Sequence, residues 1–251
     1  IPEGGSFYLY SVDKSRLLGS YTNANNSSDG NFATEIIPGD MIILEYNQPF
    51  NLKKLPEIII SEALIVFKQD NMDRIINGFG DSGPCEVNVN CPEGDTWKDE
   101  KRGVAKIVLK EGSGAYLCTG SLINNTRQDS TPYFLTANHC GPNASAADYS
   151  QWMFYFNYEA QGCSNPITDP SSQTIIGSTL IAKGFDNPSI GSDFKLLLLD
   201  QYIPESYNPF FNGWNTSNTP SAAGVGIHHP RGDIKKISTY NESLISSQYN
   251  S

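Results

Sequence analysis

The stretch Thr136-Ala137-Asn138-His139-Cys140 ends a strand-like apolar run that begins at Tyr133. Upstream, the stretch Cys118-Thr119-Gly120-Ser121-Leu122-Ile123 supplies another cysteine, 22 residues before Cys140. A disulfide between the two cysteines would pin the loop that carries His139, and a general base must be held within hydrogen-bond reach of its nucleophile. Of the three histidines, at 139, 228 and 229, His139 is therefore the best candidate for an imidazole base.

Similar short runs recur along the chain and predict a mostly β protein. Near the start, Phe7–Tyr10 and Met41–Tyr46 have the pattern of strands. The chain's 22 glycines and 15 prolines supply turns between such strands. Further along, strand candidates follow one another at the regular short spacing typical of a β-barrel: Ala105–Leu109, Tyr116–Ile123, Tyr133–Ala137, Trp152–Tyr158, Thr174–Ala182, Phe194–Leu199 and Ile234–Tyr240.

The character of the sequence changes near Gly78. Residues 1–77 contain no cysteine and predict a partial β-sandwich. From Gly78 to Glu100 the strand pattern gives way to Gly, Pro, two cysteines and many acids and amides. We therefore predict two domains, residues 1–77 and 78–251.

Composition excludes several classes of partner. A net charge of -10 disfavours a nucleic-acid groove, because phosphate binding needs clustered Lys and Arg. The longest apolar runs, around Ile58–Ile60 and Leu196–Leu199, are strand-sized and well short of the roughly 20 residues that cross a bilayer. We expect no nucleic-acid partner, no membrane insertion, no cofactor and a monomer.

The five cysteines favour disulfides over a metal site. No CxxC pair occurs among Cys85, Cys91, Cys118, Cys140 and Cys163, so zinc-knuckle spacing is absent. Disulfides indicate an oxidising compartment, and an odd count leaves one thiol whose partner lies in another chain or in a further segment.

Six blocks, in order, resemble the chymotrypsin and trypsin family of serine proteases, and most closely its bacterial lysyl endopeptidase branch. CTGSLI and TANHC resemble the CGGSLI and TAAHC motifs of that family. Residues 1–77 resemble the end of the propeptide region that precedes such proteases, including Gly19–Thr22 and Phe32–Thr34. The blocks cover most of residues 79–240: Cys85 with Val87–Gly94, Lys101–Ala105, Cys118–Asn125, Tyr133–Cys140, Ser192–Phe194 and Gly226–Pro230.

The resemblance implies an incomplete chymotrypsin-like double β-barrel after a partial pro-region. It makes His139 the catalytic base and Asp193, which is 54 residues later, the carboxylate that orients it. It also implies two disulfides, Cys118 with Cys140 and Cys91 with Cys163. Cys85 would pair with a cysteine further along and is unpaired in this chain.

The nucleophile of such a protease is not found after Asp193. In this family the order is His, Asp, then Ser within Gly-x-Ser-Gly, and no such motif follows Asp193 in the 251 residues. Gly80-Asp81-Ser82-Gly83 has the form of the motif but precedes His139, so we expect Ser82 to have no catalytic role. We expect the chain to stop before its serine.

Structural explanations exist for each candidate residue. Without the resemblance, His139 reads as a surface histidine at a strand end and Asp193 as a solvated turn residue. His228 and His229 with Asp233 would make an incomplete metal site, and a strand-start role is favoured for them. A thiol protease using Cys140 is disfavoured because adjacent strand side chains point to opposite faces.

The sequence thus predicts a fragment of a secreted serine endopeptidase acting on proteins or peptides, inactive as given, with its signal peptide upstream of residue 1. The alternative is a non-catalytic protease homologue that serves as a binding or adhesion module.

Overall fold

The computed structural model describes residues 1–26, 30–64, 78–184, 192–217 and 219–245. The chain separates into two compact units, Ile1–Ile65 and Val66–Ser251. The boundary predicted near Gly78 adjoins residues 65–77, which lie outside the described residues, so that boundary stays a prediction.

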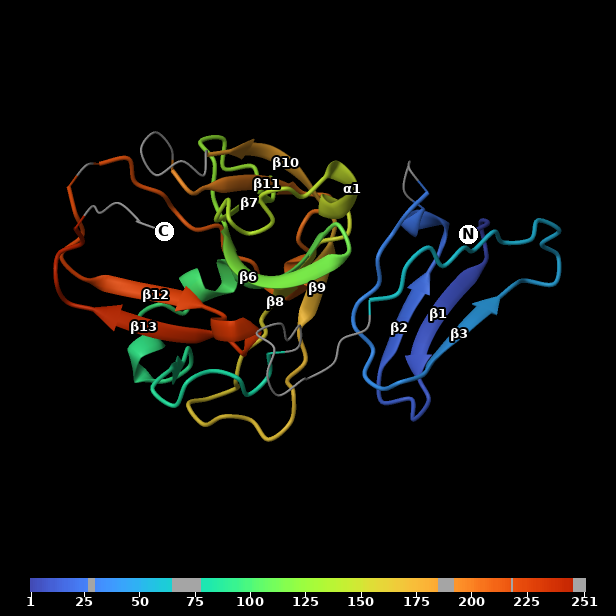
Figure 1. The fold of residues 1–251 in the computed structure, drawn as a ribbon, viewed down its shortest axis with the longest axis horizontal. Coiled ribbons are helices and arrows are strands. Elements are labelled where there is room, and N and C mark those ends of the chain that lie inside the picture. Colours follow the sequence, from blue (N-terminus) through green and yellow to red (C-terminus); the bar gives the residue numbers. More distant parts are fainter. Residues whose placement is uncertain (27–29, 65–77, 185–191, 218, 246–251) are drawn as a thin grey trace. The chain divides into compact units, whose positions relative to one another are not determined.

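The first unit is one antiparallel sheet in the order β2-β1-β3, formed by β1 (Ser6–Ser11), β2 (Leu17–Tyr21) and β3 (Ile42–Asn47) (Figure 1). Alternate residues of β1 are buried, and the small core contains Phe7, Leu9, Leu18 and Ile37. The described residues of this unit form this one sheet, and the partial β-sandwich stays a prediction. The apolar run Ile58–Ile60 forms no strand there and is exposed.

The main sheet of the second unit has seven strands in the order β10-β11-β7-β6-β5-β8-β9. The two edge strands, β9 and β10, are consecutive in the chain and are separated only by Gly177, whose φ is +90°. The end of β9 and the start of β10 therefore meet at one corner, so the sheet curls, and the predicted strand 174–182 is bent at this glycine. The strands are β5 (Val104–Glu111), β6 (Gly114–Leu122), β7 (Tyr133–Thr136), β8 (Met153–Phe156), β9 (Gln173–Ile176), β10 (Ser178–Lys183) and β11 (Lys195–Leu199).

The inside of this curled sheet is a close-packed apolar core. Ala105, Ile107 and Leu109 alternate along β5 and are at most 1% exposed. Phe134 packs edge to face against Phe154, with ring centroids 4.9 Å apart. β7 and β8 are not neighbours in the sheet, so this aromatic contact crosses the interior of the curled sheet rather than joining adjacent strands.

A second sheet of this unit has the order β12-β13-β4, from β12 (Gly224–His228), β13 (Lys236–Tyr240) and β4 (Val87–Asn88) (Figure 1). The fold is thus mostly β, with one curled antiparallel sheet and two small sheets. The helical segments are short: η1 (Asn23–Asn25), η2 (Pro92–Gly94), η3 (Glu100–Gly103), α1 (Ala146–Tyr149), η4 (Glu205–Tyr207) and η5 (Pro230–Gly232).

Candidate active site

Strand pairing brings His139 and Asp193 together. β7 and β11 are antiparallel, with Thr136 opposite Lys195. Residues that follow Thr136 therefore run alongside residues that precede Lys195, and His139 comes to lie beside Asp193 although 54 residues separate them. Their proximity follows from the register of two strands whose apolar alternation is fixed by the core.

Asp193 holds His139 at two points. Its Oδ1 accepts the backbone N–H of His139 at 2.8 Å, and its Oδ2 lies 2.5 Å from the ring Nδ1. An ionised carboxylate only accepts hydrogen bonds, so Nδ1 carries the proton and donates it. The neutral ring then has its lone pair on Nε2, which is the form a general base requires.

The carboxylate is stabilised in its charged form. Burial raises the pKa of Asp193, but hydrogen bonds from the His139 ring and from the amides of His139 and Asn138 lower it more, and the net shift is downward. The His139 and Asp193 side chains are 72% and 51% exposed. Asp193 is therefore ionised near neutral pH, and both side chains are open to a reactant from solvent.

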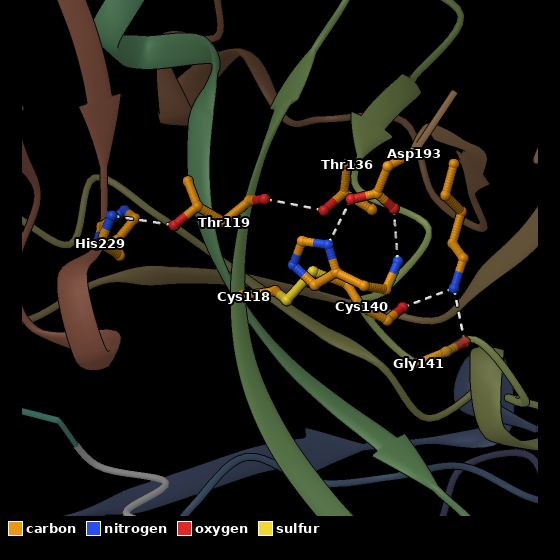
Figure 2. Close-up of a disulfide and its surroundings, with 9 residues drawn as sticks. Cys118, Thr119, Thr136, Cys140, Gly141, Asp193 and His229 are labelled. Carbon is orange, nitrogen blue, oxygen red and sulfur yellow. Dashed lines mark hydrogen bonds and ion pairs between the residues drawn. A yellow bond between two sulfur atoms is a disulfide. The ribbon is translucent and has the colours of Figure 1, made fainter. Parts of the chain in front are cut away.

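Two disulfides form, and one of them supports the loop of His139. Cys118 on β6 bonds Cys140, and Figure 2 shows this bridge. Cys140 is 4% exposed, so it anchors the residue next to the exposed His139 in the core. A second disulfide joins Cys91 to Cys163, and Cys85 is free and exposed.

Ser82 belongs to a different contact. The amides of Gly80 and Ser82 donate to the two carboxylate oxygens of Asp233, at 2.8 and 3.2 Å. Burial raises the pKa of Asp233, but the Ser82 hydroxyl and these amides lower it more. Among the described residues no hydrogen bond links Ser82 to His139, so the Gly-Asp-Ser-Gly turn here anchors the start of the second unit to Asp233.

His229 has a structural environment. It is 4% exposed, its Nδ1 lies 2.9 Å from the backbone carbonyl of Asp233, and its amide donates to Thr119 Oγ1 (Figure 2). Burial, with a contribution from Lys235, lowers its pKa well below the ordinary value, so the ring is neutral. The carboxylate of Asp233 accepts hydrogen bonds from the amides of the 80–82 turn.

The remaining alternatives for His139 and Cys140 are also decided by the disulfide. Ligand atoms of Cys118, His139 and Cys140 lie within 4.8 Å of one another, a spacing compatible with a metal ion. Both sulfurs are used in the disulfide, however, so neither is a thiolate ligand or a thiol nucleophile in this structure. The thiol-protease alternative for Cys140 is therefore wrong here.

Sequence reasoning did not find the charged residue that supports the His139 loop. Lys195, the first residue of β11, is 0% exposed, and its Nζ donates to the carbonyls of Cys140 and Gly141. The available signal was a lysine within the otherwise apolar run that follows Asp193. A lysine at a strand start normally points to solvent, so the signal is weak.

A curled antiparallel sheet that presents a disulfide-pinned His–Asp pair is the arrangement characteristic of chymotrypsin-like serine proteases. The chain belongs to the lysyl endopeptidase family: residues 79–251 match the family described as "Lysyl endopeptidase, C-terminal domain". It is also similar to a "Lysyl endopeptidase" of Pseudomonas aeruginosa, with 30% identity over 225 residues.

The similarity covers 85% of this chain and 46% of that relative, so the chain spans about half the length of the curated relative it matches. The aligned share is larger than residues 79–251 alone, so the similarity continues into the residues before 79. Among the described residues, no helix is long and apolar enough to span a membrane.

Proposed function

We propose that His139 and Asp193 are the general base and the orienting carboxylate of a serine endopeptidase of the lysyl endopeptidase type. The nucleophilic serine comes from outside residues 1–251. The observation that carries the proposal is the two-point contact of Asp193 with the His139 amide and Nδ1, since it selects the ring tautomer that a base needs.

Each group has a distinct task in this mechanism. His139 Nε2 removes the proton of the serine hydroxyl as the serine attacks the scissile carbonyl, and the imidazolium then gives that proton to the leaving amine. Asp193 stays ionised and stabilises the imidazolium; its lowered pKa fits this task. Water, activated by His139, then hydrolyses the acyl-enzyme.

Substrates and location follow from the same proposal. The substrates are proteins or peptides, and the name of the Pseudomonas relative suggests cleavage at lysine. The two disulfides fit folding in an oxidising compartment and hence secretion. The pro-region, residues 1–77, would be a separate domain of the precursor.

A second candidate is a non-catalytic homologue that binds proteins. No Gly-x-Ser-Gly motif follows Asp193 in the 251 residues, and His139 Nε2 has no hydrogen-bond partner among the described ones. For these 251 residues by themselves, the non-catalytic role is the better supported of the two.

Hydrolysis of a lysyl peptide by the natural gene product separates the two functions. Under the protease proposal, His139→Ala lowers kcat/KM by more than about 10³-fold, because the serine loses its base. The matched control is His228→Ala, which removes a partly buried imidazole on β12 and should leave kcat/KM nearly unchanged. A gene that ends at Ser251, or hydrolysis that survives His139→Ala, contradicts the protease proposal.

A further inference from the structure

Lys195 is a cation in an apolar core. It shares the inward face of β11 with Leu197 and Leu199, and all three are at most 3% exposed. Removing an ammonium group from water costs several kcal/mol unless hydrogen bonds replace its hydration. A lysine at this position therefore needs strong local compensation.

Backbone carbonyls and aromatic rings supply that compensation. Lys195 Nζ donates to the carbonyl of Cys140 at 2.6 Å and to the carbonyl of Gly141 at 2.7 Å. The same ammonium lies 5.3 Å from the ring centroid of Tyr149 and 5.1 Å from that of Trp152. Both rings are within the range of cation–π attraction.

The two carbonyls belong to the turn that directly follows His139. The amide of Cys140 closes the turn on Ala137, and Gly141 has a φ of +70°, so the backbone reverses here. A carbonyl buried at such a turn costs free energy if it has no donor. Lys195 satisfies these carbonyls from one position, which fixes the course of the chain after the histidine.

Asp193 and Lys195 thus bind adjoining parts of one loop. Asp193 accepts from the amide and Nδ1 of His139, while Lys195, two residues further along, donates to the next two carbonyls. Figure 2 shows the contact of Asp193 beside the carbonyls of Cys140 and Gly141. Asp193 and Lys195 therefore hold residues 139–141 through four hydrogen bonds, two accepted by Asp193 and two donated by Lys195.

We propose that Lys195 is a positioning residue: it fixes the backbone at residues 140 and 141 so that the His139 ring stays aligned with Asp193. This inference rests on the proposed function, because alignment matters for a base that must deliver Nε2 to a nucleophile. The Cys118–Cys140 disulfide limits how far the loop can drift, and Lys195 sets its orientation within that limit.

The test compares two buried lysines in the 251-residue chain. Lys195→Met keeps the length of the side chain and removes the donor. Lys236→Met is the matched control, because Lys236 is 1% exposed and donates to Asn88 Oδ1 at 2.8 Å, in the other sheet. The readouts are thermal unfolding and the low-field proton resonance of His139 Nδ1–H, assigned by its loss in His139→Gln.

We expect both methionine variants to be less stable and only Lys195→Met to disturb the resonance. The exchange rate of the Nδ1 proton with water should rise about tenfold or more. A tenfold change corresponds to about 1.4 kcal/mol, the size of one net hydrogen bond. If Lys195→Met does not fold, Lys195→Gln keeps a donor and should give a smaller rise in exchange. A resonance unchanged in either foldable Lys195 variant relative to Lys236→Met overturns the inference.

Failure of the underlying function has a different signature. If the unmodified chain shows no resonance of this kind, or if Asp193→Asn leaves it unchanged, His139 and Asp193 are not paired in solution and both proposals fall. If the resonance is present and depends on Asp193, but not on Lys195, only the positioning role is lost.

Discussion

Removing the two disulfides one at a time should separate global stability from the alignment of His139. In the chain-entropy estimate, the 22-residue separation of Cys118 and Cys140 corresponds to about 3.4 kcal/mol. The 72-residue separation of Cys91 and Cys163 corresponds to about 4.4 kcal/mol. Replacement of either pair by alanine should lower the unfolding free energy by amounts of this order.

The effect on the His139 resonance should have the opposite order: it should be larger for loss of the Cys118–Cys140 disulfide. Cys140 is adjacent to His139, so loss of its disulfide frees the loop and broadens the Nδ1–H resonance of His139. Loss of the Cys91–Cys163 disulfide leaves that loop intact and the resonance sharp, although the stability loss is as large or larger.

Urea unfolding followed by tryptophan fluorescence measures the stability change. Trp97, Trp152 and Trp214 all belong to the second unit, so the signal reports that unit. An equal response of the resonance to both replacements would contradict the local role of Cys118–Cys140, and a loss below about 1 kcal/mol for both would contradict the stabilising role of the disulfides.

Three other substitutions test single contacts. Asp233→Asn should destabilise the second unit by about 2 kcal/mol in urea unfolding, because the amides of the 80–82 turn lose a charged acceptor. The pKa of Asp233 is lowered in the folded protein, so its contribution to stability is complete above the ordinary value of 3.8 and is lost as pH falls below it. The unfolding free energy of the Asn variant should therefore fall less with decreasing pH than that of the parent. An identical pH dependence of the two would contradict this. Gly94→Ala should lower the melting temperature by several degrees, since a Cβ would lie 1.9 Å from the carbonyl oxygen of Val89, and an unchanged melting temperature would show that this turn adapts. The exposed thiol of Cys85 should form disulfide-linked dimers in air, visible on non-reducing gels and absent in Cys85→Ser; monomer alone in the parent would contradict its exposure.

The sequence predicted the strands of the curled sheet well where apolar residues alternate. In β11 every second residue is buried, so the period of two is preserved, whereas residues 104–109 of β5 are all buried. β2 was missed, since Gly19, with a φ of +117°, and a register shift in its pairing with β1 interrupt the alternation.

Motif order was informative for His139 and Asp193, and local composition was not informative for Lys195. His139 and Asp193 stand in short blocks whose order along the chain is specific, whereas the burial of Lys195 depends on which carbonyls the folded loop presents to it. Every residue has a backbone carbonyl, so the residue types do not show which carbonyls Lys195 contacts. Tertiary backbone geometry is therefore what sequence reasoning could not supply.

The most direct test of the central claim is fluorophosphonate labelling of the natural gene product, with the modified residue mapped by mass spectrometry. Such reagents modify only a serine whose hydroxyl is activated by a base. We expect one labelled serine outside residues 1–251, with labelling abolished by His139→Ala, strongly slowed by Asp193→Asn and retained in His228→Ala. Labelling at Ser82, labelling that survives His139→Ala, or no labelling of the natural protein would contradict it.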